Sequence, residues 1–331
     1  MRVRHLAPWL AALAGVAGLA WLARHLDWHA TVLAVRQSGW AALGVTTARA
    51  ATLLLAAIAW WRLMPHGGAG LTTVLRVRTA REGINLLLPF TAVGGDVIGA
   101  RLLARLGVTG AVAAATTLAD LLMLWSGQLV FTLAGVALLA GQGHARVAFW
   151  VLPGVVVAGL ALGGFLLFQR RGGARWIDRA AASVAARWPE LVGEGRFDLR
   201  EQLAALYARP GALLTNFALH LIGWAIDAAA PWLVLSALGY APTWAEAVVI
   251  ESLAQALRGA AFFVPAGVGV QEGGLVFLCA LYGVPAEAAL VLALVRRVAD
   301  VAIGTPGLLL WWRLEAQRPA RPPGNASLTP P

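Results

Sequence analysis

Long apolar runs separated by short polar breaks dominate this chain. Runs of about the length needed to cross a bilayer lie at 6–23, 40–64, 110–141, 147–168, 211–240 and 285–313. Two other stretches, 71–107 and 243–283, mix charges with apolar residues around a Pro-Gly break, which is typical of a re-entrant helical hairpin shielded inside protein. We therefore predict an all-α polytopic membrane protein with about six spans and two re-entrant helical hairpins.

The two hairpins carry the same sequence pattern. The segment 86–108, LLLPFTAVGGDVIGARLLARLGV, recurs in degenerate form at 262–284, FFVPAGVGVQEGGLVFLCALYGV. When Pro89 is aligned with Pro265, a glycine six residues before the proline, an acid seven residues after it and a Gly-Val pair that begins 18 residues after it all coincide. Agreement at so many distinct positions indicates an internal duplication.

The distribution of arginine orients these elements. If the six runs cross the membrane and the hairpins do not, the arginine-rich N-terminus, 62–81, the loop 169–210 and 313–321 fall on one side. The positive-inside rule makes that side cytoplasmic. Three spans separate the hairpins, so we expect inverted repeats, centred on 83–120 and 259–300, in one membrane domain over 1–313. We expect a disordered Pro-rich tail at 314–331.

Composition supports a membrane protein and excludes some functions. Apolar residues make up 60% of the chain and charged residues 13%, too little polar material to cover a soluble domain. The net charge is +10, but the arginines cluster at the ends of apolar runs and in one loop, so we predict no nucleic-acid partner. The single cysteine, Cys279, excludes an internal disulfide. The absence of lysine, with heavy use of Ala and Gly, indicates GC-rich coding and a bacterial source.

Ionisable residues inside the predicted spans and hairpins are the candidate translocation residues, because charge inside a bilayer is costly unless it is paired or lines a polar cavity. They are Asp96, Arg101, Arg105, Asp120, Glu272, Arg296, Arg297 and Asp300. The predicted hairpin breaks are Pro89, Gly94, Gly95, Pro265, Gly267 and Gly269.

Two pairs of these residues share a position in the repeat. Asp96 and Glu272 both lie just beyond the break, where buried carboxylates could couple protons. Asp120 and Arg296 both lie 31 residues after the aligned prolines, so they could face each other across the pseudo-axis. That pair could function in transport or could only fix helix packing.

The sequence shows no nucleophile–His–acid arrangement and no Cys/His metal set. Gly267 and Gly269, followed by Gly273, resemble a phosphate loop, but no βαβ unit surrounds them, so they more readily serve helix packing or a helix break. We predict no catalytic residues, no metal and no cofactor.

The two repeat segments, with 117–120 (TLAD) and Arg296-Arg297, resemble the lysylphosphatidylglycerol synthase transmembrane-region family, also called flippase-like. The form REGINLLLPFTAVGGDVIGARLL is most similar to the hopanoid-biosynthesis-associated membrane protein subgroup. The sequence departs from the family in two ways. The Glu-Arg pair that many members carry before the acid of the third span is replaced by Leu118-Ala119. No aminoacyl-transferase domain is expected, and its absence would argue against lysyl transfer.

The resemblance implies translocation of a polar-headed lipid between leaflets of the bacterial inner membrane, with both termini cytoplasmic. The cargo would be a hopanoid, a phospholipid or a lipid-linked precursor, whose headgroup the four candidate arginines would attract. Proteins of hopanoid biosynthesis are candidate partners. Two alternatives stay open: a non-catalytic scaffold for such proteins, and a membrane-embedded lipid-modifying enzyme.

Overall fold

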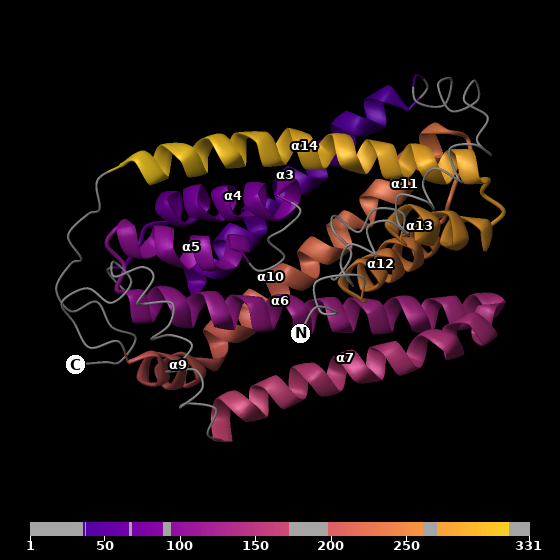
Figure 1. Cartoon of the computed structure of the whole chain (residues 1–331). Helices are drawn as coiled ribbons and strands as arrows, with labels where there is room; N and C mark the ends of the chain where they lie inside the picture. The colour runs from indigo at the N-terminus through magenta and orange to yellow at the C-terminus, as the bar shows by residue number, and fades with distance from the viewer. Residues whose placement is uncertain are drawn as a thin grey trace, which may run out of the picture. The chain divides into compact units, whose positions relative to one another are not determined.

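A computed structural model describes residue 36 and residues 38–65, 68–88, 94–171, 198–260 and 270–317 (Figure 1). All regular secondary structure in these ranges is helical, as predicted. The helices are α3 (Gly39–Arg62), α4 (Leu71–Leu87), α5 (Gly94–Arg105), α6 (Gly110–Leu139), the π-helical η2 (Ala140–His144), α7 (Ala145–Arg171), α9 (Leu199–Tyr207), α10 (Pro210–Asp227), α11 (Ala229–Ala237), α12 (Trp244–Ala260), α13 (Val270–Ala280) and α14 (Ala286–Ala316).

Three helical stretches in the described part of the chain are long and apolar enough to cross a membrane: Gly39–Arg62, Gly110–Leu167 and Pro210–Ala237. The second joins α6, η2 and α7, so these stretches contain four of the predicted spans. α14 is 31 residues long but carries three charges near its middle. The predicted first span, 6–23, lies outside the described residues. The exact number of spans stays a prediction.

A glycine separates the two predicted spans inside Gly110–Leu167. Gly143 has a φ of 91° within η2, a conformation that interrupts helical geometry and that glycine adopts without steric cost. The polar break expected between 141 and 147 is therefore a kink of π-helical backbone.

The chain forms two compact units. Unit 1 comprises Met1–Ala50, Gln128–Val155 and Trp224–Ala302, and unit 2 comprises Ala51–Gly127, Val156–Gly223 and Ile303–Pro331. Each unit holds one predicted hairpin and its own apolar core. The core of unit 1 includes Val45, Leu139, Ile250 and Leu292, and that of unit 2 includes Trp60, Leu63, Leu102 and Leu103.

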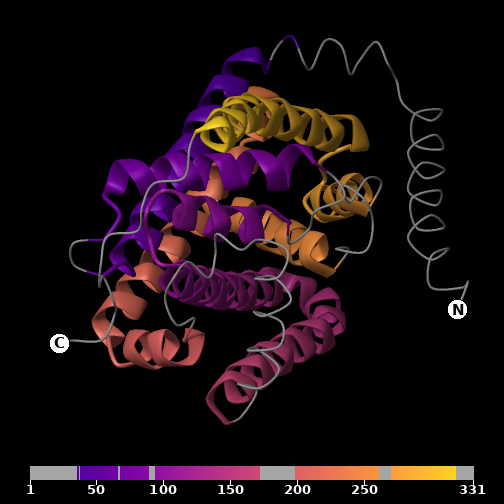
Figure 2. The same ribbon diagram turned by 60° about the vertical axis from the view of Figure 1, so that its left-hand side comes forward.

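Both hairpins consist of two helices that pack on each other, as the charged sequences predicted. α4 lies beside α5 in unit 2, and α12 lies beside α13 in unit 1 (Figures 1 and 2). Among the predicted breaks, Gly94 and Gly95 form the first turn of α5, while Pro89, Pro265, Gly267 and Gly269 lie outside the described residues. A Cβ at Gly95 would collide with the side chain of Asn85, so the close approach of α4 and α5 requires glycine there.

The second helix of each hairpin ends in the same turn. Gly107 and Gly283 both have positive φ, 100° and 70°. The N–H of Val108 donates to the carbonyl of Leu103 at 3.1 Å, and the N–H of Val284 donates to that of Cys279 at 3.1 Å. These are the bonds of a glycine-terminated helix end, and the aligned residues are all 176 positions apart. The duplication read from sequence is therefore matched by local backbone structure in each unit. That the repeats are inverted stays a prediction.

The first hairpin also packs tightly against α14 within unit 2. A Cβ at Gly83 of α4 would lie 2.6 Å from the backbone nitrogen of Leu308 and 2.7 Å from the carbonyl oxygen of Gly304. A Cβ at Gly307 would collide with the backbone of α4. Glycines on both helices thus bring the two backbones into direct contact, as is common for helices in membranes.

Candidate functional site

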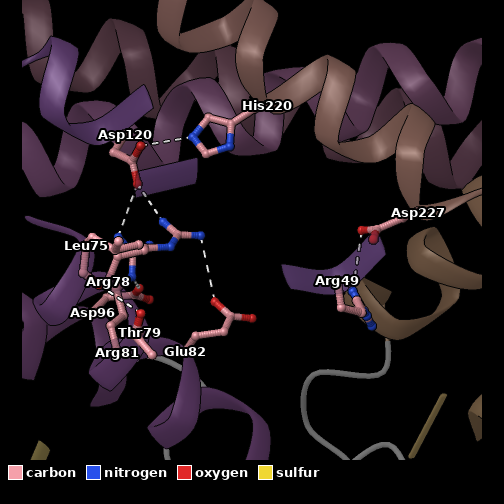
Figure 3. A network of polar contacts seen from close by, with 10 residues as sticks. All are labelled: Arg49, Leu75, Arg78, Thr79, Arg81, Glu82, Asp96, Asp120, His220 and Asp227. Carbon is pink, nitrogen blue, oxygen red and sulfur yellow. Dashed lines mark hydrogen bonds and ion pairs between the residues drawn. The ribbon is translucent and has the colours of Figure 1, made fainter. Parts of the chain in front are cut away.

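A single carboxylate is the centre of a buried polar network in unit 2. Asp120 of α6 is fully buried. One of its oxygens, Oδ2, accepts hydrogen bonds from Arg78 Nη1 at 3.0 Å and Arg81 Nη1 at 3.1 Å. The other, Oδ1, accepts from Asn216 Nδ2 at 3.0 Å. It also lies 2.9 Å from His220 Nε2 (Figure 3). One carboxylate therefore joins α4, α6 and α10.

Arg81 connects this network to the second helix of the hairpin. Its Nε forms an ion pair with Asp96, in the first turn of α5, while its Nη1 binds Asp120. Its guanidinium carbon lies 5.3 Å from the ring centroid of Trp60, which adds a cation–π contact. A buried arginine here has two carboxylates and an aromatic face, so its charge is well compensated.

The network is close to electrically neutral. Two arginines, Arg78 and Arg81, face Asp96, Asp120 and Glu82, whose carboxylate lies 3.7 Å from Arg78. Two arginines against three carboxylates leave a formal charge of −1. We call these residues, with Asn216 and His220, the first cluster.

Unit 1 contains a second cluster, built from α3, α12, α14 and the last residue of α10. Arg296 Nη2 of α14 donates to Glu251 Oε1 of α12 at 2.8 Å, and Gln255 Nε2 donates to the same oxygen at 2.8 Å. Arg49 of α3 binds both Asp227 Oδ2, at 3.4 Å (Figure 3), and Asp300 Oδ1, at 3.2 Å.

A small cavity lies beside this second cluster. Its volume is about 20 Å³, room for about one water. Its charged and polar lining consists of Arg258, Gln271, Glu272, Arg296, Arg297 and Asp300. Arg296 is buried, and its Nη1 has no hydrogen-bond partner among the described residues. A buried, unsatisfied N–H of a cation is costly, so Arg296 favours an anion or a water as a further partner.

The acid at the shared repeat position has the same type of partner in both hairpins. Asp96 pairs with Arg81, and Glu272 pairs with Arg297 at 3.2 Å. Both acids lie in the first turn of the hairpin's second helix, where the helix dipole stabilises a negative charge. The arginines come from different places: Arg81 from the hairpin's own first helix and Arg297 from α14.

The sequence of the chain matches the model of one protein family. The sequence model described as lysylphosphatidylglycerol synthase TM region matches residues 9–307. The chain belongs to this family. No curated protein and no solved structure matches the chain. Family membership and the long apolar helices make this a membrane protein.

Two of the candidate residues have a contact that the family resemblance did not suggest. Arg101 of α5 pairs with Glu315 through both nitrogens, at 2.6 and 3.2 Å. Arg105 donates to the backbone carbonyls of Glu315 and Gln317 at 3.0 and 2.8 Å. α14 runs to Ala316, three residues beyond the predicted end of the last span, and these arginines bind its C-terminus. Their position suits a structural role at that helix end.

Asp120 and Arg296 each have partners inside their own unit: Asp120 in the first cluster and Arg296 in the second. Their predicted pairing with each other stays a prediction. Within the described residues, no group of three or more His, Cys, Asp or Glu side chains is placed to hold a metal.

Several residues of the two clusters were not predicted from the sequence as candidate site residues. Arg78, Arg81 and Glu251 were visible as charges in the predicted hairpins, and His220 and Asp227 as polar residues in an apolar span. Most of their partners lie far along the chain. For Arg78, Arg81 and Glu251 one signal was available: the first helix of each hairpin and the span that follows that hairpin carry opposite net charges.

Proposed function

We propose that this membrane protein moves a polar-headed lipid between the leaflets of the bacterial inner membrane, with both termini cytoplasmic. The proposed cargo is a hopanoid, a phospholipid or a lipid-linked precursor, and proteins of hopanoid biosynthesis are the proposed partners. Membership of the lysylphosphatidylglycerol synthase TM region family supports a role with membrane lipids. The proposed route is non-enzymatic and needs no cofactor.

The observation that carries this proposal is the arginine-lined cavity of unit 1. Three arginines line it, and one of them, Arg296, presents a buried nitrogen without a partner among the described residues. A phosphate has several acceptor oxygens and is matched by guanidinium groups. The present volume admits about one water, so a headgroup would enter only if α13 moved relative to its neighbours in unit 1.

Charge balance favours proton coupling. The second cluster and the lining of its cavity are formally neutral, because four arginines lie among four carboxylates. The arginines are Arg49, Arg258, Arg296 and Arg297, and the acids are Asp227, Glu251, Glu272 and Asp300. A phosphate monoester or diester that carried one negative charge would unbalance the cluster in a low-dielectric region. If the phosphate replaced Glu272 as the partner of Arg297, protonation of Glu272 would restore neutrality. Asp96 would act in the same way beside Arg81 in the other hairpin.

Leaflet exchange in reconstituted vesicles tests the proposal. Labelled phospholipids and hopanoids are supplied to vesicles with wild-type protein, with Glu272→Gln or with Asp96→Asn. Glu201→Gln is the matched control, because Glu201 is exposed at the start of α9. We expect exchange of at least one lipid by wild type and control, and a loss of about tenfold or more in each hairpin variant. Wild-type rates in both folded variants would contradict the assigned roles.

The two alternatives give different results in the same preparation. A lipid-modifying enzyme would produce a lipid of changed mass without faster exchange. A scaffold would produce neither, would tolerate neutralisation of the buried acids and would depend instead on the loop 169–210 for its partners.

A further inference from the structure

A second cavity lies in unit 2, and none of its lining residues belongs to the first cluster. It has a volume of about 610 Å³, and its described lining comes from the end of α3, the described residues between α3 and α4, and the start of α10. Its described lining residues are Trp61, Arg62, Met64, Pro65, Gly68, Ala69, Gly70, Arg209, Gly211 and Ala212. The cavity lies among the arginine-rich segments that the positive-inside rule assigns to the cytoplasmic side.

We propose that this cavity, the interfacial pocket, binds a phosphate group held by a resident anionic lipid or supplied as free phosphate. This pocket shares no lining residue with the cavity proposed for translocation. The pocket combines an amphipathic aromatic ring, Trp61, with two cations, Arg62 and Arg209. Trp and Arg together are typical of the lipid headgroup level.

The backbone around the pocket favours an anion. α4 begins at Leu71 and α10 begins at Pro210, so the first turns of two helices border the cavity. At the start of α10, Pro210 has no N–H, and the N–H groups of Ala212 and Leu213 donate to the carbonyl of Arg209 at 3.1 and 3.3 Å. The contribution of the helix starts is therefore mainly the partial positive charge of the helix dipole. The small residues of the lining let an anion approach this backbone closely.

Arg209 is held in place by the protein. Its Nη1 donates to the carbonyl of Leu63 at 3.3 Å and its Nη2 to that of Arg62 at 3.5 Å, at the end of α3. These long bonds fix the guanidinium beside the pocket. The side chain of Arg62 is exposed and is thus available as a second cation.

Gly211 offers a sharp test. A Cβ at Gly211 would have no atom within 4 Å, and its φ is not positive, so a side chain fits there without strain. Gly211→Asp would place a carboxylate at the pocket, and Gly211→Asn would place an amide of the same shape. An acid in the first turn also favours helix α10, so the aspartate variant should fold at least as well as its control.

The experiment measures binding to the full chain in detergent by ligand-dependent thermal unfolding at constant ionic strength. The probes are dihexanoyl phosphatidylglycerol, phosphate-free dihexanoylglycerol and inorganic phosphate. We expect a phosphate-bearing probe to stabilise wild type. Its apparent Kd should rise about tenfold in Gly211→Asp and Arg62→Gln and stay within about twofold in Gly211→Asn.

Each outcome decides the proposal. Stabilisation by inorganic phosphate with this variant pattern assigns a free phosphate site, and stabilisation by the phospholipid alone assigns a lipid headgroup site. No stabilisation by either probe, or an unchanged Kd in Gly211→Asp, overturns the proposal. If Gly211→Asp does not fold, Arg62→Gln decides in the same way. Leaflet exchange by Gly211→Asp is measured separately, because the translocation proposal survives the failure of this one.

Discussion

Replacement of Asp120 by asparagine tests whether the first cluster holds unit 2 together. Both oxygens of this fully buried carboxylate are in use, by two arginines, an amide and a histidine. Arg81 would keep Asp96 as a counter-ion, whereas among the described residues Arg78 would keep Glu82 alone, at 3.7 Å. Removing one partner of a buried ion pair costs about 3–5 kcal/mol in soluble proteins. Because polar contacts between membrane helices are weaker, we expect a loss near the lower limit, about 3 kcal/mol.

The free energy of unfolding is measured by titration of detergent-solubilised protein with a denaturing detergent, with helicity followed by circular dichroism. The exposed Glu201→Gln should stay within about 0.5 kcal/mol of wild type. The double variant Asp120→Asn/Arg78→Gln should recover at least about 1 kcal/mol, because it removes the cation left without a full partner. If Asp120→Asn were as stable as Glu201→Gln, the cluster would not carry the stabilisation inferred from its contacts.

The remaining predictions concern packing, turns and the helix end. Gly83→Ala should destabilise the protein by about 1–3 kcal/mol because its Cβ would meet the backbone of α14, whereas Gly163→Ala, with nothing within 4 Å, should be neutral or stabilising in the same titration. Gly107→Ala and Gly283→Ala should each cost about 1 kcal/mol, measured by the same method, because both φ values are positive; equal stability to wild type would count against the shared turn. Glu315→Gln should change the unfolding free energy by less than about 1 kcal/mol, because the Arg101–Glu315 ion pair is partly exposed. The same variant should speed hydrogen exchange of the amides in the last turn of α14. Unchanged exchange would argue against a role of Arg101 and Arg105 in holding that helix end.

Elements with a strong local signal could be predicted from the sequence. The apolar runs gave the long helices, and the charged stretches around the Pro-Gly breaks gave four short helices in two pairs. Gly107 and Gly283 were visible as aligned glycines because a left-handed turn demands that residue type.

The polar clusters could only be predicted in part. Asp120 was identified because an acid is conspicuous in an apolar helix, but its partners lie 39 to 100 residues away, and no local rule selects them. The translocation role of Arg101 and Arg105 stays a prediction. Their contacts with the end of α14 could not be predicted, because Glu315 lies beyond the predicted last span. Ion pairing depends on tertiary contacts, which helical periodicity does not specify.

The most direct test of lipid translocation compares one buried arginine with one exposed arginine. The initial rate of lipid exchange between leaflets is measured in vesicles that contain wild type, Arg296→Gln or Arg200→Gln; Arg296 lines the cavity of unit 1 and Arg200 is exposed on α9. The account predicts exchange by wild type and Arg200→Gln, and a rate lower by about tenfold or more for folded Arg296→Gln. Equal rates for the three proteins, or no exchange of any lipid by folded wild type, would contradict it.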